Sequence, residues 1–189
     1  MDKEYLHDVA TKGAILGVIM LASHLLEQTM IISGEVSRMG LLAAEMIAVF
    51  AIYVYLLYRF TKSYSQRSTA EEGFPFGKGW GYVITLAVFT SIIVGLGKYI
   101  YTHSIIGYTD YIKGVVGLYE NILSTTPLSP QLVSTYEQML ERIAEQPEPS
   151  FISTISSTLW SYIFLGGLVG LIIAGIVKRE PNIFSDEQN

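Results

Sequence analysis

The stretch that decides the fold is MGLLAAEMIAVFAIYVYLLY, residues 39–58, in which Glu45 is the one charged side chain. A helix that crosses the hydrocarbon core of a bilayer needs about 20 mostly apolar residues. An apolar run of this length with so little charge is rare in the helices of soluble proteins. Residues 39–58 are therefore predicted to form a transmembrane helix.

Three further apolar blocks lie at about 13–32, 81–101 and 159–177. Aromatic residues flank the blocks, as expected of side chains at membrane–water interfaces. They are Tyr58, Phe60, Trp80 and Tyr82 on one side, and Tyr99, Tyr101, Trp160 and Tyr162 on the other. The chain is predicted to be an all-α polytopic membrane protein with four transmembrane helices, folded as a single membrane domain over residues 1–189.

Composition excludes several classes of function. Half of the 189 residues are hydrophobic, and there is no cysteine, which excludes disulfides, thiol nucleophiles and cysteine metal sites. The net charge of -5 argues against a nucleic-acid-binding protein, which usually carries a basic surface. No small-residue cleavage site follows a short apolar core near the N-terminus, so we expect no removable signal peptide.

The distribution of lysine and arginine predicts the orientation. In a four-span chain, the N-terminus, the loop between spans two and three, and the C-terminus share one side. That side holds Lys3, Lys12, Arg59, Lys62, Arg67, Lys78, Lys178 and Arg179, whereas the other holds Arg38, Lys113 and Arg142, with Lys98 at the membrane edge. Because lysine and arginine concentrate in cytoplasmic loops, both termini are predicted to be cytoplasmic.

The segment 102–158, between spans three and four, is predicted to be a periplasmic helical insertion. Apolar residues recur at helical spacing in two parts of it, which predicts two amphipathic helices. Between them, Ser129 is expected to be the N-cap of the second helix, with Pro130 at its first position. Pro147 and Pro149 are expected to end that helix.

The other connections are shorter. Residues 33–38 are expected to turn spans one and two into a hairpin, and residues 61–79, rich in serine and glycine, to have little regular structure. Residues 73–79 do not form a Walker phosphate loop, which needs four residues between its glycines and Ser or Thr after the lysine. Instead, the aromatic residues of this segment are expected at the lipid interface, with Lys78 at the phosphate level: Phe74, Phe76 and Trp80.

Several short motifs resemble a known family. They are Lys12-Gly13-Ala14-Ile15-Leu16-Gly17, Tyr58-Arg59, Gly73-Phe74-Pro75-Phe76-Gly77-Lys78-Gly79-Trp80, Tyr99-Ile100-Tyr101, Gly166-Gly167 and Lys178-Arg179-Glu180-Pro181. The chain resembles domain of unknown function 4199 over nearly its whole length. That family consists of small four-span proteins found mainly in Bacteroidetes, and often has Asp-Pro after the third span, where this chain has Thr109-Asp110-Tyr111. The resemblance implies a bacterial inner-membrane location and brings no catalytic residues.

Ionisable side chains within the spans are informative, because a charge at the centre of a membrane helix costs roughly 2.5 to 3.5 kcal/mol. Glu27 lies about 8 Å, and Glu45 roughly 9 Å, from the predicted outer ends of their helices. The side chain of Lys98 leans inward toward the same depth. His24 and Gln28 share the helix face of Glu27. These residues predict a polar cluster that opens outward, with Glu27, Glu45 and Lys98 in electrostatic contact.

Three interpretations of this cluster remain open. Lys98 can pair with a carboxylate and fix helix packing, as buried ions generally need partners. The cluster can instead be a ligand-binding pocket or a proton path. A metal site is the third interpretation, built from His24, Glu27, Glu45 and His103. No metal or cofactor is assigned to the chain on this basis.

Small residues form two smooth helix faces, which let helix backbones approach closely. One consists of Gly13 and Gly17, and the other of Gly166, Gly170 and Ala174. Such a face can pack within the chain or against another subunit.

The sequence shows no catalytic constellation but abundant contact surfaces. It therefore favours a non-catalytic inner-membrane protein, a structural or accessory subunit that packs against a membrane protein partner or a second copy of itself within the lipid bilayer. The alternative is binding or transport of a small molecule, lipid or ion through Glu27, Glu45 and Lys98. A membrane enzyme that acts on a lipid-linked substrate is a third hypothesis.

Overall fold

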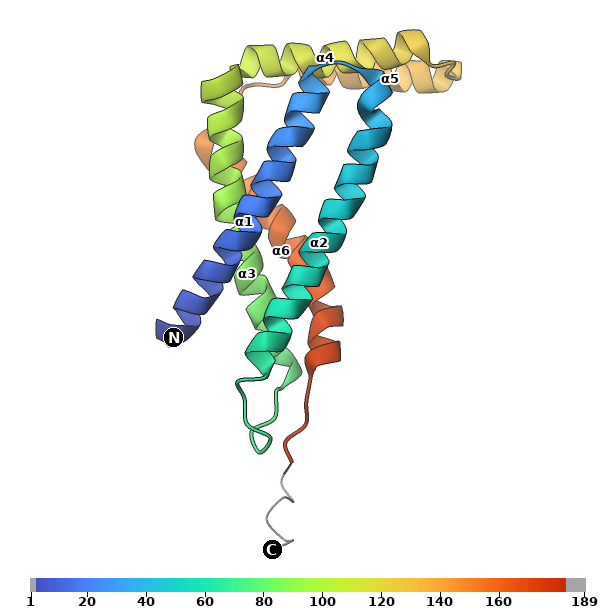
Figure 1. The fold of residues 1–189 in the computed structure, drawn as a ribbon. Helices are drawn as coiled ribbons and strands as arrows, with labels where there is room; N and C mark the ends of the chain where they lie inside the picture. Colours follow the sequence, from blue (N-terminus) through green and yellow to red (C-terminus); the bar gives the residue numbers. More distant parts are fainter. Residues whose placement is uncertain (1–2, 183–189) are drawn as a thin grey trace, which may run out of the picture.

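Four long helices make up most of the computed structural model, which describes residues 3–182 (Figure 1). They are α1 (Lys3–Ile32), α2 (Met39–Ser65), α3 (Phe76–Ile100) and α6 (Phe151–Val177). All four are long and apolar enough to cross a membrane. The predicted all-α polytopic membrane fold with four spans is therefore confirmed.

The two ends of this bundle differ. At the terminal end, α1 begins and α6 ends (Figure 1). Across the opposite end, which we call the capped end, lie α4 (Tyr108–Thr125) and α5 (Pro130–Glu145). A short 3-10 helix, η1 (Val36–Arg38), turns α1 into α2 there.

The capping helix α4 is fixed to the hairpin between α1 and α2. The side-chain amide of Asn121 donates a hydrogen bond of 2.9 Å to the carbonyl oxygen of Gly34. Gly114 of α4 lies so close to α1 that a Cβ at this position would stand 2.9 Å from the Cα of Ile32. The insertion between spans three and four thus forms a helical layer over the bundle.

The predicted start of the second helix of this layer is correct. The backbone N–H of Leu132 donates to the Ser129 hydroxyl at 3.4 Å, and Pro130 is the first residue of α5. α5 packs beside α4, where the rings of Tyr119 and Tyr136 lie 5.9 Å apart. No residue of α5 is buried. The layer is held to the bundle mainly by α4.

Helix α3 is the centre of the bundle and packs most extensively against α1 and α6. Its buried side chains include Tyr82, Leu86 and Val94. Tyr82 and Leu86 pack with Leu16 of α1 and Ile173 of α6, among others, in one core. In a membrane such packing rests on close van der Waals contact, so the smooth faces of the helices matter.

Both small-residue faces are used within the chain. Gly13 lies against Phe89 of α3, and a Cβ on Gly17 would stand 2.8 Å from the Cβ of Ile93. On the other side of α3, Gly166 and Gly170 face Ala87 and Val83, and Ala174 is buried beside Gly79. These glycines allow α1 and α6 to approach α3 closely.

Helix α2 is the least buried of the four spans. Its buried residues, Tyr53, Leu57, Thr61 and Ser65, all lie in its second half, toward the terminal end. The capped ends of α2 and α3 stand on opposite sides of the bundle in Figure 1. The bundle is therefore tight at the terminal end and more open at the capped end.

The helices run beyond the predicted membrane spans of 13–32, 39–58, 81–101 and 159–177, because polar residues near the ends of the spans continue the helices. The connection expected at 61–79 shortens to 66–75, since α2 runs to Ser65 and α3 begins at Phe76.

Phe74 was expected at the lipid interface, and this is wrong. Its side chain is fully buried, and its backbone forms two hydrogen bonds with Arg179, Phe74 N to Arg179 O at 2.8 Å and Arg179 N to Phe74 O at 3.0 Å. Lys78, expected at the phosphate level, lies with its ammonium 5.7 Å from the centres of the Phe74 and Tyr64 rings. The segment after α6 folds back over this loop and covers it.

Candidate functional site

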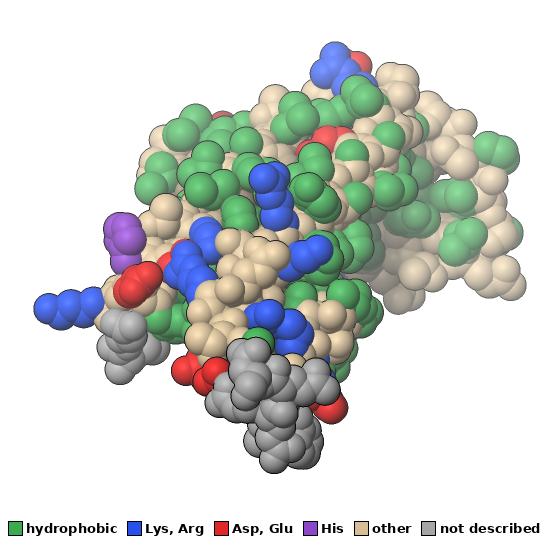
Figure 2. Space-filling model, turned by 60° about the horizontal axis from the view of Figure 1, so that its bottom comes forward, with side chains coloured by type: hydrophobic (Ala, Val, Ile, Leu, Met, Phe, Trp, Pro, Cys, Tyr) green, Lys and Arg blue, Asp and Glu red, His purple; other side chains and the backbone are tan. Residues whose placement is uncertain are grey.

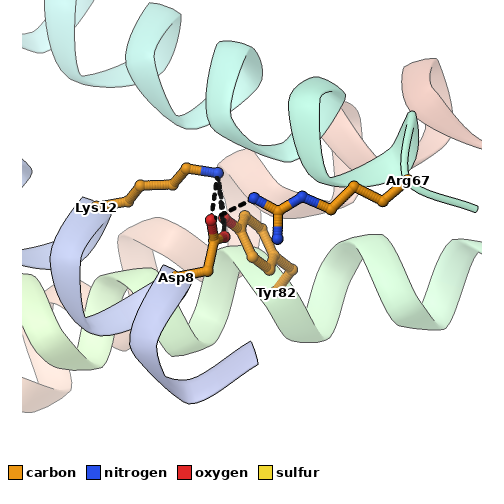
Figure 3. A network of polar contacts seen from close by, with 4 residues as sticks. All are labelled: Asp8, Lys12, Arg67 and Tyr82. Atoms are coloured by element: carbon orange, nitrogen blue, oxygen red, sulfur yellow. Dashed lines mark hydrogen bonds and ion pairs between the residues drawn. The ribbon is translucent and has the colours of Figure 1, made fainter. Parts of the chain in front are cut away.

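Four side chains form a polar network at the terminal end: Asp8, Lys12, Arg67 and Tyr82 (Figure 3). The Asp8 carboxylate accepts hydrogen bonds from Lys12 at 2.9 and 3.0 Å, from Arg67 at 2.7 Å and from the Tyr82 hydroxyl at 2.5 Å. Because Asp8 belongs to α1, Arg67 to the 66–75 loop and Tyr82 to α3, the network links three parts of the chain. We call it the Asp8 network.

Each charge of the Asp8 network has its partner inside the network. The hydrogen bond that Arg67 donates to Asp8 raises the pKa of the guanidinium above its usual value, so Arg67 stays charged. Lysine and arginine side chains gather around this end of the molecule (Figure 2). The arrangement is that of a structural connection between helices.

Sequence reasoning missed this network. Asp8 and Lys12 stand four residues apart on a helix, which is a recognisable ion-pair spacing. Lys12 and Arg67 were interpreted as cytoplasmic charges that set the orientation in the membrane, and Tyr82 as an aromatic residue at the membrane interface. Their meeting at Asp8 depends on how α1, the loop and α3 pack.

The second polar region lies toward the capped end and contains the residues predicted as a cluster: His24, Glu27, Gln28, Glu45 and Lys98. We keep the name polar cluster for these five residues. The Ser23 hydroxyl donates to one carboxylate oxygen of Glu45 at 2.5 Å, which links α1 to α2. The Nδ1 atom of His24 lies 3.3 Å from a carboxylate oxygen of Glu27 on the same helix.

Among residues 3–182, four buried side-chain nitrogen or oxygen atoms have no hydrogen-bond partner. Three of them belong to the polar cluster, and they are Nε2 of His24, Oε1 of Gln28 and Oε2 of Glu45. The fourth is the hydroxyl of Tyr53, a fully buried residue of α2. A buried polar group left without a partner costs about 1 to 3 kcal/mol, so such atoms are rare in folded proteins.

Lys98 is placed differently from the prediction. No hydrogen bond or ion pair joins its ammonium to another residue of the described chain, although Glu27 is near enough to attract it. Glu45 pairs with Ser23 instead of approaching Lys98. The predicted contact of all three charges is therefore wrong for Glu45, because α2 and α3 stand apart toward the capped end.

The side chain of Lys98 lines a cavity of about 200 Å³, which we call the Lys98 cavity. Its walls come from α3, from α4, from the linker between α5 and α6, and from the start of α6. Among the polar lining residues are Thr102, His103, Tyr111 and Thr154. Through Lys98, the polar cluster thus reaches a space large enough for a small solute.

One wall of the Lys98 cavity is a π-helical segment, η2 (Tyr101–Ile106), that continues α3. His103 connects this segment to the linker, since its Nε2 lies 3.1 Å from the carbonyl oxygen of Pro149 and 3.5 Å from the Glu148 carboxylate. Its Nδ1 lies 3.0 Å from the carbonyl oxygen of Tyr99. π-helical turns are rare and often occur at functional sites.

The chain matches one protein-family model over most of its length. A family model described as protein of unknown function (DUF4199) matches residues 11–179. The chain belongs to this family. No curated protein and no solved structure matches the chain.

The DUF4199 match extends from α1 to the end of α6 and includes the whole polar cluster. It also includes Lys12, Arg67 and Tyr82, whereas Asp8 lies before its first residue. As a DUF4199 protein, the chain is a membrane protein of uncharacterised family.

Metal coordination was one interpretation of the polar cluster in this DUF4199 protein. Within residues 3–182, no three His, Asp or Glu side chains come close enough together to hold a metal ion. The metal interpretation fails for His103 in particular, because its ring nitrogens face backbone carbonyl oxygens of Tyr99 and Pro149. What the cluster does offer is a set of buried donors and acceptors that the protein leaves unpaired.

Proposed function

We propose that this protein binds a small hydrophilic solute in the polar cluster. The observation that carries the proposal is the set of three buried, unpartnered atoms on His24, Gln28 and Glu45. In a purely structural cluster, each such atom would be expected to have a partner within the protein, as in the Asp8 network. A polar solute that bonds to these atoms would remove the cost of leaving them unpaired.

We place the protein in a bacterial inner membrane, with both termini in the cytoplasm and the capped end outside. The basic residues around the terminal end support this orientation (Figure 2). The Lys98 cavity adjoins the capped end, so the solute would enter from the periplasmic side. The proposal concerns binding, with transport as one possible use of it.

The test is thermal unfolding of the full chain in lipid nanodiscs with a panel of amines, amino acids, carboxylates, phosphate and sugars. A solute at about 100 times its dissociation constant stabilises the folded protein by roughly 2.7 kcal/mol, which is readily measured. The variants Gln28→Leu and Glu45→Gln should fold but lose this stabilisation. Gln138→Leu and Glu137→Gln, at exposed positions of α5, are matched controls that should keep it.

Two results together would overturn the proposal. One is that no solute of the panel stabilises the wild-type protein. The other is that Gln28→Leu unfolds at a higher temperature than the wild type. That result would show that the unpaired amide only lowers the stability of the folded protein.

A second candidate is the accessory subunit that the sequence favoured. The observation in its favour is α5, an amphipathic helix without a buried residue, on which Leu132 is half exposed. Its weakness is that Gly13, Gly17, Gly166 and Gly170 already pack against α3. Isolation in a mild detergent separates the two candidates, since an accessory subunit should co-purify with a partner or a second copy. A lone monomer would exclude it.

A further inference from the structure

We infer that the Lys98 cavity binds a small oxyanion, meaning a carboxylate or phosphate group, held by the ammonium of Lys98 and the hydroxyl of Thr102. This inference rests on the proposed binding function and names the chemistry of its ligand.

The first argument is the charge of Lys98. Lys98 lines the cavity, and its ammonium has no ion pair or hydrogen bond within residues 3–182. The nearest carboxylate of the cluster, on Glu27, already lies 3.3 Å from His24. Glu148, the other acidic residue beside the cavity wall, is 59% exposed and lies beside His103. A half-buried cation that lines a cavity without a direct partner attracts an anion.

The second argument is the hydroxyl of Thr102, whose residue is 5% exposed. A helical threonine usually donates to the carbonyl oxygen four residues earlier, as Thr85 does at 2.8 Å and Thr90 at 2.9 Å on the same helix. Thr102 has no such bond, nor any other bond within the described residues. It is the second residue of the π-helical segment, where the backbone follows an i to i+5 pattern. The wider turn therefore leaves the Thr102 hydroxyl unpaired at the wall of the cavity.

The third argument concerns the hydrogen-bonding groups on the other walls of the cavity. Burial raises the pKa of the Tyr111 phenol, and its hydroxyl already has a hydrogen bond with the side chain of Gln28. The Thr154 hydroxyl already bonds to the carbonyl oxygen of Ser150, and Tyr108 bonds to that of Gln146. Among the residues that line the cavity, Lys98 and Thr102 are left without a side-chain partner in the described chain, and both can donate. Charged donors bind oxyanions through short, strong hydrogen bonds.

The fourth argument is size. Pockets for drug-sized ligands usually have volumes of about 300 to 1,000 Å³. The Lys98 cavity, at about 200 Å³, is smaller than that range. It suits a single oxyanion group, either a free small anion or the headgroup phosphate of a lipid that enters from the capped end.

The experiment is equilibrium dialysis of the full chain, in nanodiscs of phosphatidylcholine alone, with labelled phosphate and labelled acetate at constant ionic strength. We expect saturable binding of one anion per chain. Lys98→Met should weaken it roughly 10- to 100-fold, and Thr102→Val roughly 3- to 10-fold. Lys113→Met and Thr85→Val are matched controls, at an exposed lysine of α4 and at a threonine whose hydroxyl is already bonded, and should bind as the wild type does.

A second arm separates the two sources of the oxyanion. Nanodiscs that contain anionic phosphatidylglycerol are compared with the phosphatidylcholine discs by thermal unfolding. Stabilisation by phosphatidylglycerol that disappears in Lys98→Met, without binding of free phosphate or acetate, assigns the site to a lipid headgroup. Since Lys98→Met can fail to fold, Thr102→Val provides a second comparison in which the charge of Lys98 is retained, and part of the stabilisation should be lost.

The inference is overturned if Lys98→Met and Thr102→Val bind the anions as tightly as the wild type. It is also overturned if neither arm shows an oxyanion bound while an amine or sugar stabilises the protein through Gln28 and Glu45. In that second case the proposed function stands and only its ligand class changes. If no solute of any class binds, both fail.

Discussion

Helix α1 contributes to two polar regions, the Asp8 network at the terminal end and the polar cluster toward the capped end. Asp8 accepts hydrogen bonds from three side chains, whereas Glu45 accepts one, from Ser23, and its second oxygen has no partner among the described residues. The first region satisfies its own charges. The second leaves donors and acceptors available, which is expected of a site that meets something outside the chain.

The helices also pack more closely around the Asp8 network than around the polar cluster. At the terminal end, all four spans pack closely and the Tyr64 and Tyr82 rings stack 4.3 Å apart. Toward the capped end, α2 has no buried residue before Tyr53. Polar groups in a tight region can be paired by neighbours from several helices. In a looser region there is room for a solute but there are fewer neighbours to act as partners.

The largest expected effect comes from removing the centre of the Asp8 network. Asp8→Ala leaves Lys12, Arg67 and Tyr82 without their common acceptor and should lower the free energy of unfolding by about 3 kcal/mol. Unfolding in nanodiscs followed by circular dichroism measures this. Asp110→Ala is the matched control, since its ion pair with Lys113 is exposed, and a change as large there would mean that the network is not special.

The next effect compares two buried tyrosines that differ in their partners. Tyr82→Phe removes a hydrogen bond to a carboxylate and should destabilise the protein by about 1.5 to 3 kcal/mol. Tyr53→Phe removes a hydroxyl that has no partner within the described residues and should be neutral or stabilising. Chemical unfolding of both variants under one condition tests the comparison. Equal losses would contradict the contrast between the two regions.

A smaller effect of opposite sign is expected at Glu45. Glu45→Met replaces a buried, incompletely paired carboxylate by an apolar side chain of similar length, and should stabilise the empty protein by up to about 1 kcal/mol. Ser23→Ala, which removes only the donor, should destabilise it because both carboxylate oxygens are then unpaired. A clear loss of stability in Glu45→Met would assign Glu45 to the structure.

The smallest effect is the pH dependence of the Arg67 contribution. Because the pKa of Arg67 in the folded protein is raised, its contribution is fully present below the usual arginine pKa and is lost only as pH rises through the folded value. The difference in unfolding free energy between wild type and Arg67→Gln should therefore be constant between about pH 6 and pH 9. Thermal unfolding at several pH values checks this, and a slope would contradict it.

Local signals predicted much of the fold. The apolar run at 39–58 marked a span, and Ser129 with Pro130 marked the start of α5, because each of these features acts over a few residues of the chain. The small-residue faces were also visible in the sequence. Whether they would meet a helix of the same chain could not be predicted, since that depends on the packing of α1 and α6 on α3.

The candidate site was only partly predictable. Glu27, Glu45 and Lys98 were predicted to lie together because they lie at similar depths in the membrane. Depth alone does not reveal that α2 and α3 stand apart at the capped end. The unpaired hydroxyl of Thr102 follows from a π-helical turn, which the helical periodicity of 102–123 does not reveal. The covering of Phe74 by the segment after α6 is likewise a tertiary event, with its two partners more than a hundred residues apart.

The pairing of Phe74 with Arg179 has a consequence for the order of assembly. During synthesis the 66–75 loop leaves the ribosome long before Arg179, whose backbone bonds to Phe74 and whose guanidinium bonds to the carbonyl oxygen of Ser65. Gly73, with a φ of +62°, also fits directly beneath the backbone around Pro181. The loop can therefore reach its final conformation only after the last span has been inserted, so the last-made part of the bundle completes the connection between its second and third spans.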